Sequence, residues 1–222
     1  MHRAVQSCFL SVVFFFNNAL AVEKTTEPHV HPGILKPYQS EPPELVLTPV
    51  QRGELEDGVV VYIRQTIDNA ERGVAVFRVK ASVQTIWSVI KDFRSYPQWI
   101  EDIDEVEIYH QRDDFIYVRF QAGGVFGNTT WYVEHEYPRG DRNWGIWRLD
   151  YDYRSDIDDS VGYWRVTPVV GQDNVSEVVY SADLRLSGLI ASLFEESLID
   201  SSLKDASIWV RREAESLTTL NQ

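Results

Sequence analysis

The sequence predicts an α+β fold in which a curved antiparallel sheet of about seven strands wraps around a long C-terminal helix. Between residues 59 and 186, short runs of alternating apolar and polar residues are separated by turn-forming residues, which is typical of consecutive hairpins. Residues 189–219 contain neither glycine nor proline and repeat apolar residues at helical spacing. That apolar stripe should bury against the sheet, so we expect the helix on its concave face.

The strands and helices follow one another in a simple order. Residues 59–67 and 73–81 should form a hairpin. Ser82 is a good N-cap for a following helix, which should stop near Tyr96 and Pro97 because a residue before proline avoids the helical region. The remaining strands are expected at residues 105–110, 115–122, 129–137, 145–153, 161–169 and 175–186.

The N-terminal part of the chain has a different composition. Residues 1–21 combine one fixed positive charge, an apolar core and a small-residue site ending at Ala21, which predicts a cleaved signal peptide and export to a periplasm or the exterior. The apolar core is shorter than the roughly 20 residues that span a bilayer, so no stable membrane span is expected. Residues 22–56 hold six of the nine prolines and are expected to be a linker or extended arm, which leaves residues 57–222 for the folded domain.

Charge and cysteine content exclude several classes of function. The 222 residues are 44% hydrophobic and carry 34 acidic against 21 basic residues, a formal charge of −13, which argues against a nucleic-acid partner. The single cysteine, Cys8, provides neither a disulfide framework nor a thiolate metal site. His29 and His31 lie in the arm without a third ligand, so we expect solvated side chains there. No metal or other cofactor is expected.

Alternation along the strands predicts one strongly aromatic face. Trp131, Val133 and His135 share a side of one strand, and further rings from the neighbouring strands share the same face. Such rings on a concave surface either fill a solid core or leave a cavity with a few polar groups, and both interpretations remain open. The further rings on this face are Trp147, Tyr151, Trp164 and Tyr180.

Motifs of the common catalytic sites are absent from the sequence. It contains no G-x-S-x-G elbow, no phosphate-binding glycine loop with lysine and no H-E-x-x-H. His135 is the one weak candidate for an acid or base, and the alternative is a core histidine without a catalytic role.

Three stretches resemble the START-like superfamily, which includes polyketide cyclases, lipid-transfer domains and coenzyme Q-binding proteins. Residues 76–99 (VFRVKASVQTIWSVIKDFRSYPQW) are similar to its opening strand and helix, residues 162–168 (GYWRVTP) to a late strand, and residues 203–214 (LKDASIWVRREA) to its C-terminal helix. The resemblance implies a helix-grip fold with an apolar pocket between sheet and helix. It also implies that Trp99 lies near the pocket mouth, and that residues 123–127 form either a flap or a plain hairpin loop.

The function expected from this resemblance is binding or transport of a hydrophobic small molecule such as a lipid, a quinone or a polyketide-like compound, with possible transient contact to a membrane or a protein. One alternative is a cyclase or dehydratase that uses the same pocket. Another is an envelope interaction module with a filled groove, in which the arm binds a protein partner. The residues expected to line the pocket are Trp99, Trp131, Val133, His135, Trp147, Tyr151, Trp164, Tyr180 and Phe194.

Overall fold

The structure is a computed structural model of the chain. It describes residues 27–67, 70–123, 128–137, 140, 142–186 and 195–220. The predicted signal peptide, Phe194 and most of the 123–127 turn lie outside the described residues. In chain order, the elements are α1 (Pro49–Glu56), β1 (Val61–Ile67), β2 (Ala70–Val79), α2 (Val83–Lys91), the 3-10 helix η1 (Phe93–Ser95), α3 (Tyr96–Trp99), β3 (Ile103–Arg112), β4 (Phe115–Ala122), β5 (Thr129–Glu136), β6 (Trp144–Leu149), β7 (Asp159–Pro168), β8 (Ser176–Arg185) and α5 (Glu195–Leu220).

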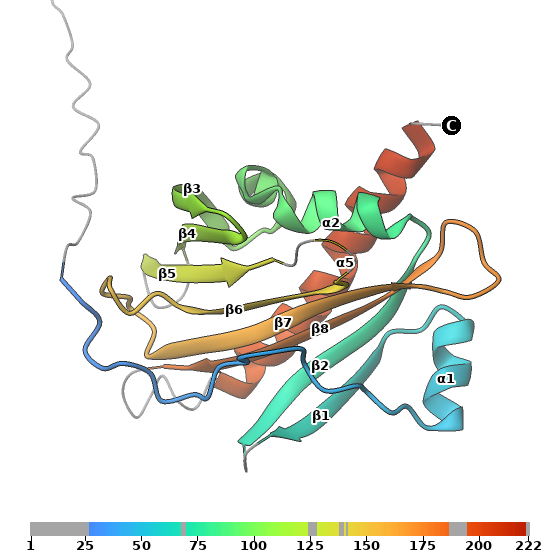
Figure 1. Ribbon diagram of the computed structural model, residues 1–222, viewed down its shortest axis with the longest axis horizontal. Helices are drawn as coiled ribbons and strands as arrows, with labels where there is room; N and C mark the ends of the chain where they lie inside the picture. Colours follow the sequence, from blue (N-terminus) through green and yellow to red (C-terminus); the bar gives the residue numbers. More distant parts are fainter. Residues whose placement is uncertain are drawn as a thin grey trace, which may run out of the picture.

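In the described part of the chain, eight strands form one antiparallel sheet in the order β1-β2-β8-β7-β6-β5-β4-β3 (Figure 1). Strands β3 to β8 form a meander, while β2 pairs with both β8 and β1. The predicted α+β fold, an antiparallel sheet with a long C-terminal helix, is confirmed. Its eight strands correspond one to one to the eight strand ranges expected from the sequence, and its two edges are β1 and β3.

The concave face is covered by α5 and α2. Helix α5 packs against β2, β8 and α2, and it buries Leu203, Ala206 and Val210 in the main core. It lies almost directly on β2 because Gly73 has no side chain: a Cβ at Gly73 would come 2.7 Å from both Ile199 Cγ2 and Leu203 Cδ1. A glycine in the strand therefore fixes how closely the helix approaches the sheet.

The convex face is covered by the arm and α1. The Thr48 hydroxyl accepts from Gln51 N and the Gln51 side chain accepts from Thr48 N, a capping box that starts α1 with Pro49 in its first turn. Leu55 of α1 is fully buried in a second apolar cluster on this face. Its other buried members are Val61, Val74, Val76, Trp144, Ile146, Tyr163 and Val179.

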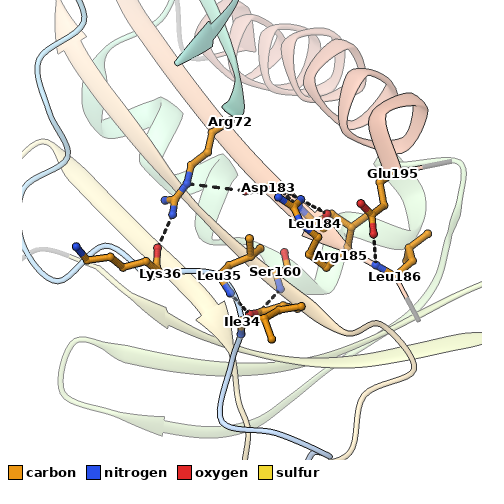
Figure 2. A network of polar contacts seen from close by, with 11 residues as sticks. Ile34, Leu35, Lys36, Arg72, Ser160, Asp183, Leu184, Arg185, Leu186 and Glu195 are labelled. Atoms are coloured by element: carbon orange, nitrogen blue, oxygen red, sulfur yellow. Dashed lines mark hydrogen bonds and ion pairs between the residues drawn. The ribbon is translucent and has the colours of Figure 1, made fainter. Parts of the chain in front are cut away.

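Buried polar groups bind the arm to the sheet (Figure 2). The carboxylate of Asp159, fully buried at the start of β7, accepts from the backbone N–H groups of Ile34 and Leu35 at 2.7 Å each. A second attachment is buried Arg72 of β2, whose guanidinium donates to the carbonyl of Lys36. The arm is thus an integral part of the folded unit, because its departure would break these hydrogen bonds and expose the apolar cluster that its residues cover.

Arg72 of β2 lies beside a second buried charged residue, Asp183, on the neighbouring strand β8. Its Nε lies 3.9 Å from Asp183 Oδ2, and both side chains are almost completely buried. Burial raises the pKa of the Asp183 carboxyl above its usual value, and the guanidinium groups of Arg185 and Arg72 oppose that rise.

Among the described residues, two element boundaries differ by four residues or more from those expected. Helix α2 ends at Lys91, and Pro97 lies in the first turn of α3, where proline is well tolerated because no backbone donor is needed there. Strand β6 ends at Leu149, four residues earlier than expected. Asp150 causes this, since its carboxylate accepts from Asp152 N and its carbonyl from Tyr153 N, which folds the chain into a turn.

The arm histidines also differ from expectation. His29 is buried rather than solvated: its Nε2 lies 2.9 Å from the carbonyl of Asp158 and its Nδ1 accepts from Ser155 N. His31 packs edge-on against it and accepts from Gly33 N. These side chains thus serve the docking of the arm.

Candidate ligand-binding site on the concave face

An aromatic wall is formed by neighbouring strands on the concave face. Trp164 of β7 and Tyr180 of β8 are register partners whose ring centroids lie 4.1 Å apart, and Trp147 of β6 stacks on Tyr180 at 5.5 Å. The Trp147 ring lies over Gly162, where a Cβ would come 2.0 Å from Trp147 Cζ2. The Tyr180 hydroxyl is 3.0 Å from Ser202 Oγ, so the wall is tied to α5.

Helices α3 and α5 add a second group of rings. Trp99 stacks on Trp209 of α5 with centroids 6.1 Å apart, and Trp209 also contacts Tyr96 and Trp164. The Tyr96 hydroxyl donates to the carbonyl of Ile90 at 2.6 Å. The Trp99–Trp209 stack is thus continuous with the wall of the sheet.

Two polar groups lie among these rings without a hydrogen bond of good geometry. His135 lies in β5, and Tyr137 is the first residue after that strand. Their rings stack with parallel planes and centroids 6.0 Å apart. The Tyr137 hydroxyl oxygen is buried and no described residue bonds to it. His135 Nδ1 is also buried without a hydrogen bond of good geometry, while the backbone groups of Ile116 and Val133 that face the imidazole raise its pKa against the effect of burial. An unpartnered buried polar atom costs about 1–3 kcal/mol. Two such groups in stacked rings on an otherwise apolar face suit a ligand that carries a polar atom.

Burial fixes the charge state of this pair. Desolvation lowers the pKa of His135 to about 3, far below its ordinary 6.5, and raises the pKa of Tyr137 well above its usual range. At neutral pH the imidazole is therefore uncharged and the phenol is protonated. A group that transfers protons works best with a pKa near the operating pH, so this pair is better suited to hydrogen bonding than to acid–base catalysis.

Most of the residues predicted for the pocket lie together. His135 and Trp147 are in ring contact, and Trp131 stacks on Phe120, which in turn contacts His135. Val133 belongs to the same core, as do three of the other predicted residues. Those three are Trp99, Trp164 and Tyr180.

Two predicted residues lie elsewhere or outside the described chain. Tyr151 packs partly against the main core, but it follows the end of β6. Its hydroxyl donates to Asp159 at 2.8 Å and its ring lies 6.1 Å from His29 of the arm. Tyr151 thus belongs to the attachment of the arm. Phe194 lies outside the described residues.

Sequence reasoning missed several residues of the site. Tyr137 follows His135 by two residues and therefore shares the face that alternation predicts for Trp131, Val133 and His135, yet nothing in the sequence distinguishes its hydroxyl from others. Trp209 follows the buried residues Leu203 and Ala206 at helical spacing, a signal that was present in the pattern. Three further rings outside the predicted list contact one another: Phe93 of η1, Tyr96 of α3 and Phe120 of β4.

The concave rings pack against one another, and two hollows of the described structure lie away from them. One, of about 300 Å³, is lined by the turn between β7 and β8. The other, of about 520 Å³, lies between β1 and α5. A ligand on the concave face would therefore have to displace rings as it enters.

Two properties of the described residues concern metal binding and membrane insertion. Among the described residues, no three or more side chains of His, Cys, Asp and Glu are grouped so that they could hold a metal ion. None of the described helices has both the length and the apolar character needed to cross a bilayer.

Comparison with solved structures shows the same fold in proteins of low sequence identity. The STAR-related lipid transfer protein of Xanthomonas axonopodis has a TM-score of 0.57 at 15% identity, covering 70% of this chain and 93% of its own. The Zhui aromatase/cyclase of a Streptomyces species scores 0.56 at 15% identity, with 70% and 94% covered. Human StAR-related lipid transfer protein 5 scores 0.56 at 11% identity, with 73% and 84% covered.

The family assignment follows from the sequence. No curated protein matches this chain. A family model described as polyketide cyclase / dehydrase and lipid transport matches residues 72–220, from the beginning of β2 to the end of α5. The resemblance to START-like proteins is thus confirmed, while the arm, α1 and β1 lie outside the matched region. Because the match covers most of the chain, the protein belongs to the polyketide cyclase / dehydrase and lipid transport family.

Proposed function

We propose that the protein binds and carries a hydrophobic small molecule between its sheet and α5, with His135 Nδ1 and the Tyr137 hydroxyl as the polar contacts. The observation that carries this proposal is that two stacked rings among the concave aromatics, His135 and Tyr137, each have a buried polar atom without a hydrogen bond of good geometry. The neutral imidazole and the protonated phenol both suit a ligand carbonyl or hydroxyl. The ligand class is therefore an amphiphile with one such group, such as a lipid, a quinone or a polyketide-like compound.

The apolar part of the ligand supplies the affinity. Burying apolar surface contributes about 25 cal/mol per Å², so transfer of a mostly apolar molecule out of water needs no charged group. The polar pair would then determine orientation, because a ligand that leaves both atoms unpartnered forfeits a hydrogen bond in a dry site.

Entry would require separation of rings, and the Trp99–Trp209 stack is the proposed gate. Trp99 is the last residue of the single-turn helix α3, and its carbonyl accepts from Arg212 Nη2 at 3.0 Å. A single-turn helix outside the sheet is expected to move at less cost than the rings of Trp147 and Trp164, because those two rings are borne by strands that the hydrogen bonds of the sheet hold in place.

A cyclase or dehydratase in the same pocket is the alternative. The Zhui aromatase/cyclase with this fold is an enzyme by its name, and the family description includes both activities. The burial-shifted pKa values of His135 and Tyr137 favour binding, because neither group exchanges protons readily near pH 7.

The test is native mass spectrometry of the protein purified from its own cells, followed by organic extraction of the released compound. We expect one hydrophobic compound per chain in the wild type and a strong loss of it in Tyr137→Phe. Tyr109→Phe is the matched control, since Tyr109 has its hydroxyl hydrogen-bonded to Asp150 at 2.6 Å away from the concave core. A ligand-free wild type, or equal retention in the two variants, would contradict the proposal. Chemical change of the extracted compound on incubation with the protein would favour the enzyme alternative.

Export is proposed on the pattern of residues 1–21 alone. Cleavage after Ala21 would leave a mature chain of residues 22–222 without cysteine, which suits an oxidising compartment. The intact mass of the native protein tests this: we expect a chain that begins at Val22, and a mass that includes residues 1–21 would contradict it.

A further inference from the structure

Strand β1 lies at one edge of the sheet, and its residues precede the region that the family model matches. Strand β1 pairs with β2 in seven consecutive register steps, from Val61↔Val76 to Ile67↔Ala70, without a bulge. Among the described residues, its other side has no strand partner, because β1 ends the sheet. An unpaired strand edge of this kind presents free N–H and C=O groups to any extended segment.

The opposite edge of the sheet is protected. Strand β3 has two register irregularities, between Ile103 and Glu105 and between Ile108 and His110. It also presents three exposed carboxylates, two of which pair with Arg119 of β4. Bulges and charges are the usual protection of an edge strand, and they make β3 a poor template for a further strand. In contrast, β1 has a regular register, no proline and no acidic residue.

A groove lies beside the unprotected edge. The hollow of about 520 Å³ between β1 and α5 falls within the size range of ligand sites. On β1 it is lined by Tyr62, Ile63 and Arg64, and Tyr62 is half exposed. On α5 it is lined by Leu203, which is buried at the base, and by Asp200 and Lys204. An edge strand beside a helix, with a hollow between them, is suited to strand addition, because alternate side chains of an added strand would point into the hollow.

Charge indicates which extended segment fits. Arg64 is paired with Asp200 at 2.7 Å, which leaves Lys204, an exposed cation, without an ion pair among the described residues. A carboxylate on the added strand would satisfy Lys204, although the protein as a whole carries a charge of −13. A second copy of this chain fits less well. Symmetric antiparallel pairing of two β1 strands would centre on Arg64 and place like charges opposite each other.

We propose that β1 and α5 form a docking groove for an extended peptide of a partner protein, which adds to β1 as a further strand. The peptide places an apolar side chain between Tyr62 and Leu203, and an acidic side chain two residues away against Lys204. The spacing of two follows from strand geometry, in which residues i and i+2 share a face. This site lies on the edge-strand side of α5 and does not depend on ligand binding to the concave rings.

The probe is a set of synthetic seven-residue peptides with threonine at the fixed positions. Position 3 is Phe, Leu, Val or Ala, and position 5 is Glu, Asp, Gln or Lys. Binding is measured by fluorescence anisotropy with the folded chain, and hydrogen exchange of residues 61–67 is followed with and without peptide. We expect the tightest peptides to combine a large apolar residue with an acid and to slow exchange in β1.

Charge reversal provides the decisive comparison. Lys204→Glu should weaken the acidic peptides by about tenfold, the value of one charge pair of roughly 1.4 kcal/mol, and should shift the preference at position 5 to lysine. Lys80→Glu, an equal charge change at an exposed position outside the groove, should leave binding unchanged. The proposal is overturned if no peptide slows exchange in β1, or if Lys204→Glu keeps the preference for acid. It is also overturned if β1 becomes protected with rising protein concentration in the absence of peptide, because the occupant is then a second copy.

Discussion

The substitution Tyr137→Phe should stabilise the ligand-free protein, although it removes a buried hydrogen-bonding group. The Tyr137 hydroxyl is buried and no described residue bonds to it. In the folded, ligand-free protein the hydroxyl has lost its hydrogen bonds to water and has no protein partner in their place, so its burial lowers the free energy of unfolding. If the hydroxyl serves to bind a ligand, its removal should stabilise the ligand-free protein and weaken ligand binding.

The magnitude follows from the cost of an unpartnered polar group. Leaving such a group buried costs about 1–3 kcal/mol, and the small void left by the missing oxygen offsets part of the gain. We therefore expect Tyr137→Phe to raise the free energy of unfolding by about 1 kcal/mol. The matched change Tyr109→Phe removes a bond of 2.6 Å to the Asp150 carboxylate and should lower the free energy of unfolding by about 1.5–3 kcal/mol.

Urea unfolding at pH 7 measures both variants. The seven tryptophans provide the fluorescence signal, and ligand is first removed by extraction of the unfolded protein followed by refolding. Opposite signs for the two variants support the account. If Tyr137→Phe destabilises the protein as much as Tyr109→Phe does, then the Tyr137 hydroxyl has a structural partner and the proposed polar contact is wrong.

Three further predictions concern the arm, the buried histidine His135 and the packing of the Trp147 ring on Gly162. Asp159→Ala should lower the free energy of unfolding by about 3 kcal/mol and expose residues 27–48 to protease, because two arm N–H groups lose their acceptor. The exposed control Asp152→Ala should change the free energy of unfolding by less than about 0.5 kcal/mol, and equal losses would mean that Asp159 does not hold the arm. Burial holds the pKa of His135 at about 3 against 6.5 in the unfolded chain, so only the unfolded chain takes up the proton between these values and stability is lost as pH falls. Between pH 8 and pH 5, the free energy of unfolding of the wild type, measured with urea, should fall by about 2 kcal/mol more than that of His135→Phe. If the two proteins show the same dependence of this free energy on pH, the histidine has the same pKa in the folded and unfolded states. Gly162→Ala should lower the free energy of unfolding by at least about 3 kcal/mol, since its Cβ would overlap the Trp147 ring, and an unchanged midpoint in thermal unfolding would refute that packing.

The sidedness of the sheet could be predicted from the sequence because a strand repeats every two residues. Trp164 and Tyr163 fall on opposite faces, and the structure places the first in the concave core and the second beneath the arm. The long helix was equally predictable, since its apolar stripe repeats at helical spacing over several turns.

The docking of the arm could not be predicted. The attachments to Asp159 join residues more than 120 positions apart, as Leu35 and Asp159 do, and the arm contributes backbone N–H or C=O groups, which do not distinguish one residue from another in the sequence. No local period marks such contacts, so a proline-rich segment with little apolar repetition reads as a linker. The burial of His29 follows from the same long-range docking.

The polar pair of the site was also beyond sequence reasoning. Alternation placed His135 and Tyr137 on the inner face, yet the absence of a hydrogen bond of good geometry is a property of everything around them. Tyr151 packs partly against the predicted core, but the bond of its hydroxyl to Asp159 beside the arm was not predictable. It was assigned to that face by extending a strand that Asp150 in fact ends two residues before it.

The most direct test of the central claim is a crystal structure of the protein purified with its ligand from its own cells. The account predicts electron density for one hydrophobic molecule between the sheet and α5, with an oxygen within hydrogen-bonding distance of His135 Nδ1 or the Tyr137 hydroxyl. It also predicts that the Trp99–Trp209 stack differs from its ligand-free arrangement. A bound molecule elsewhere, with the concave rings still in mutual contact, would contradict the claim.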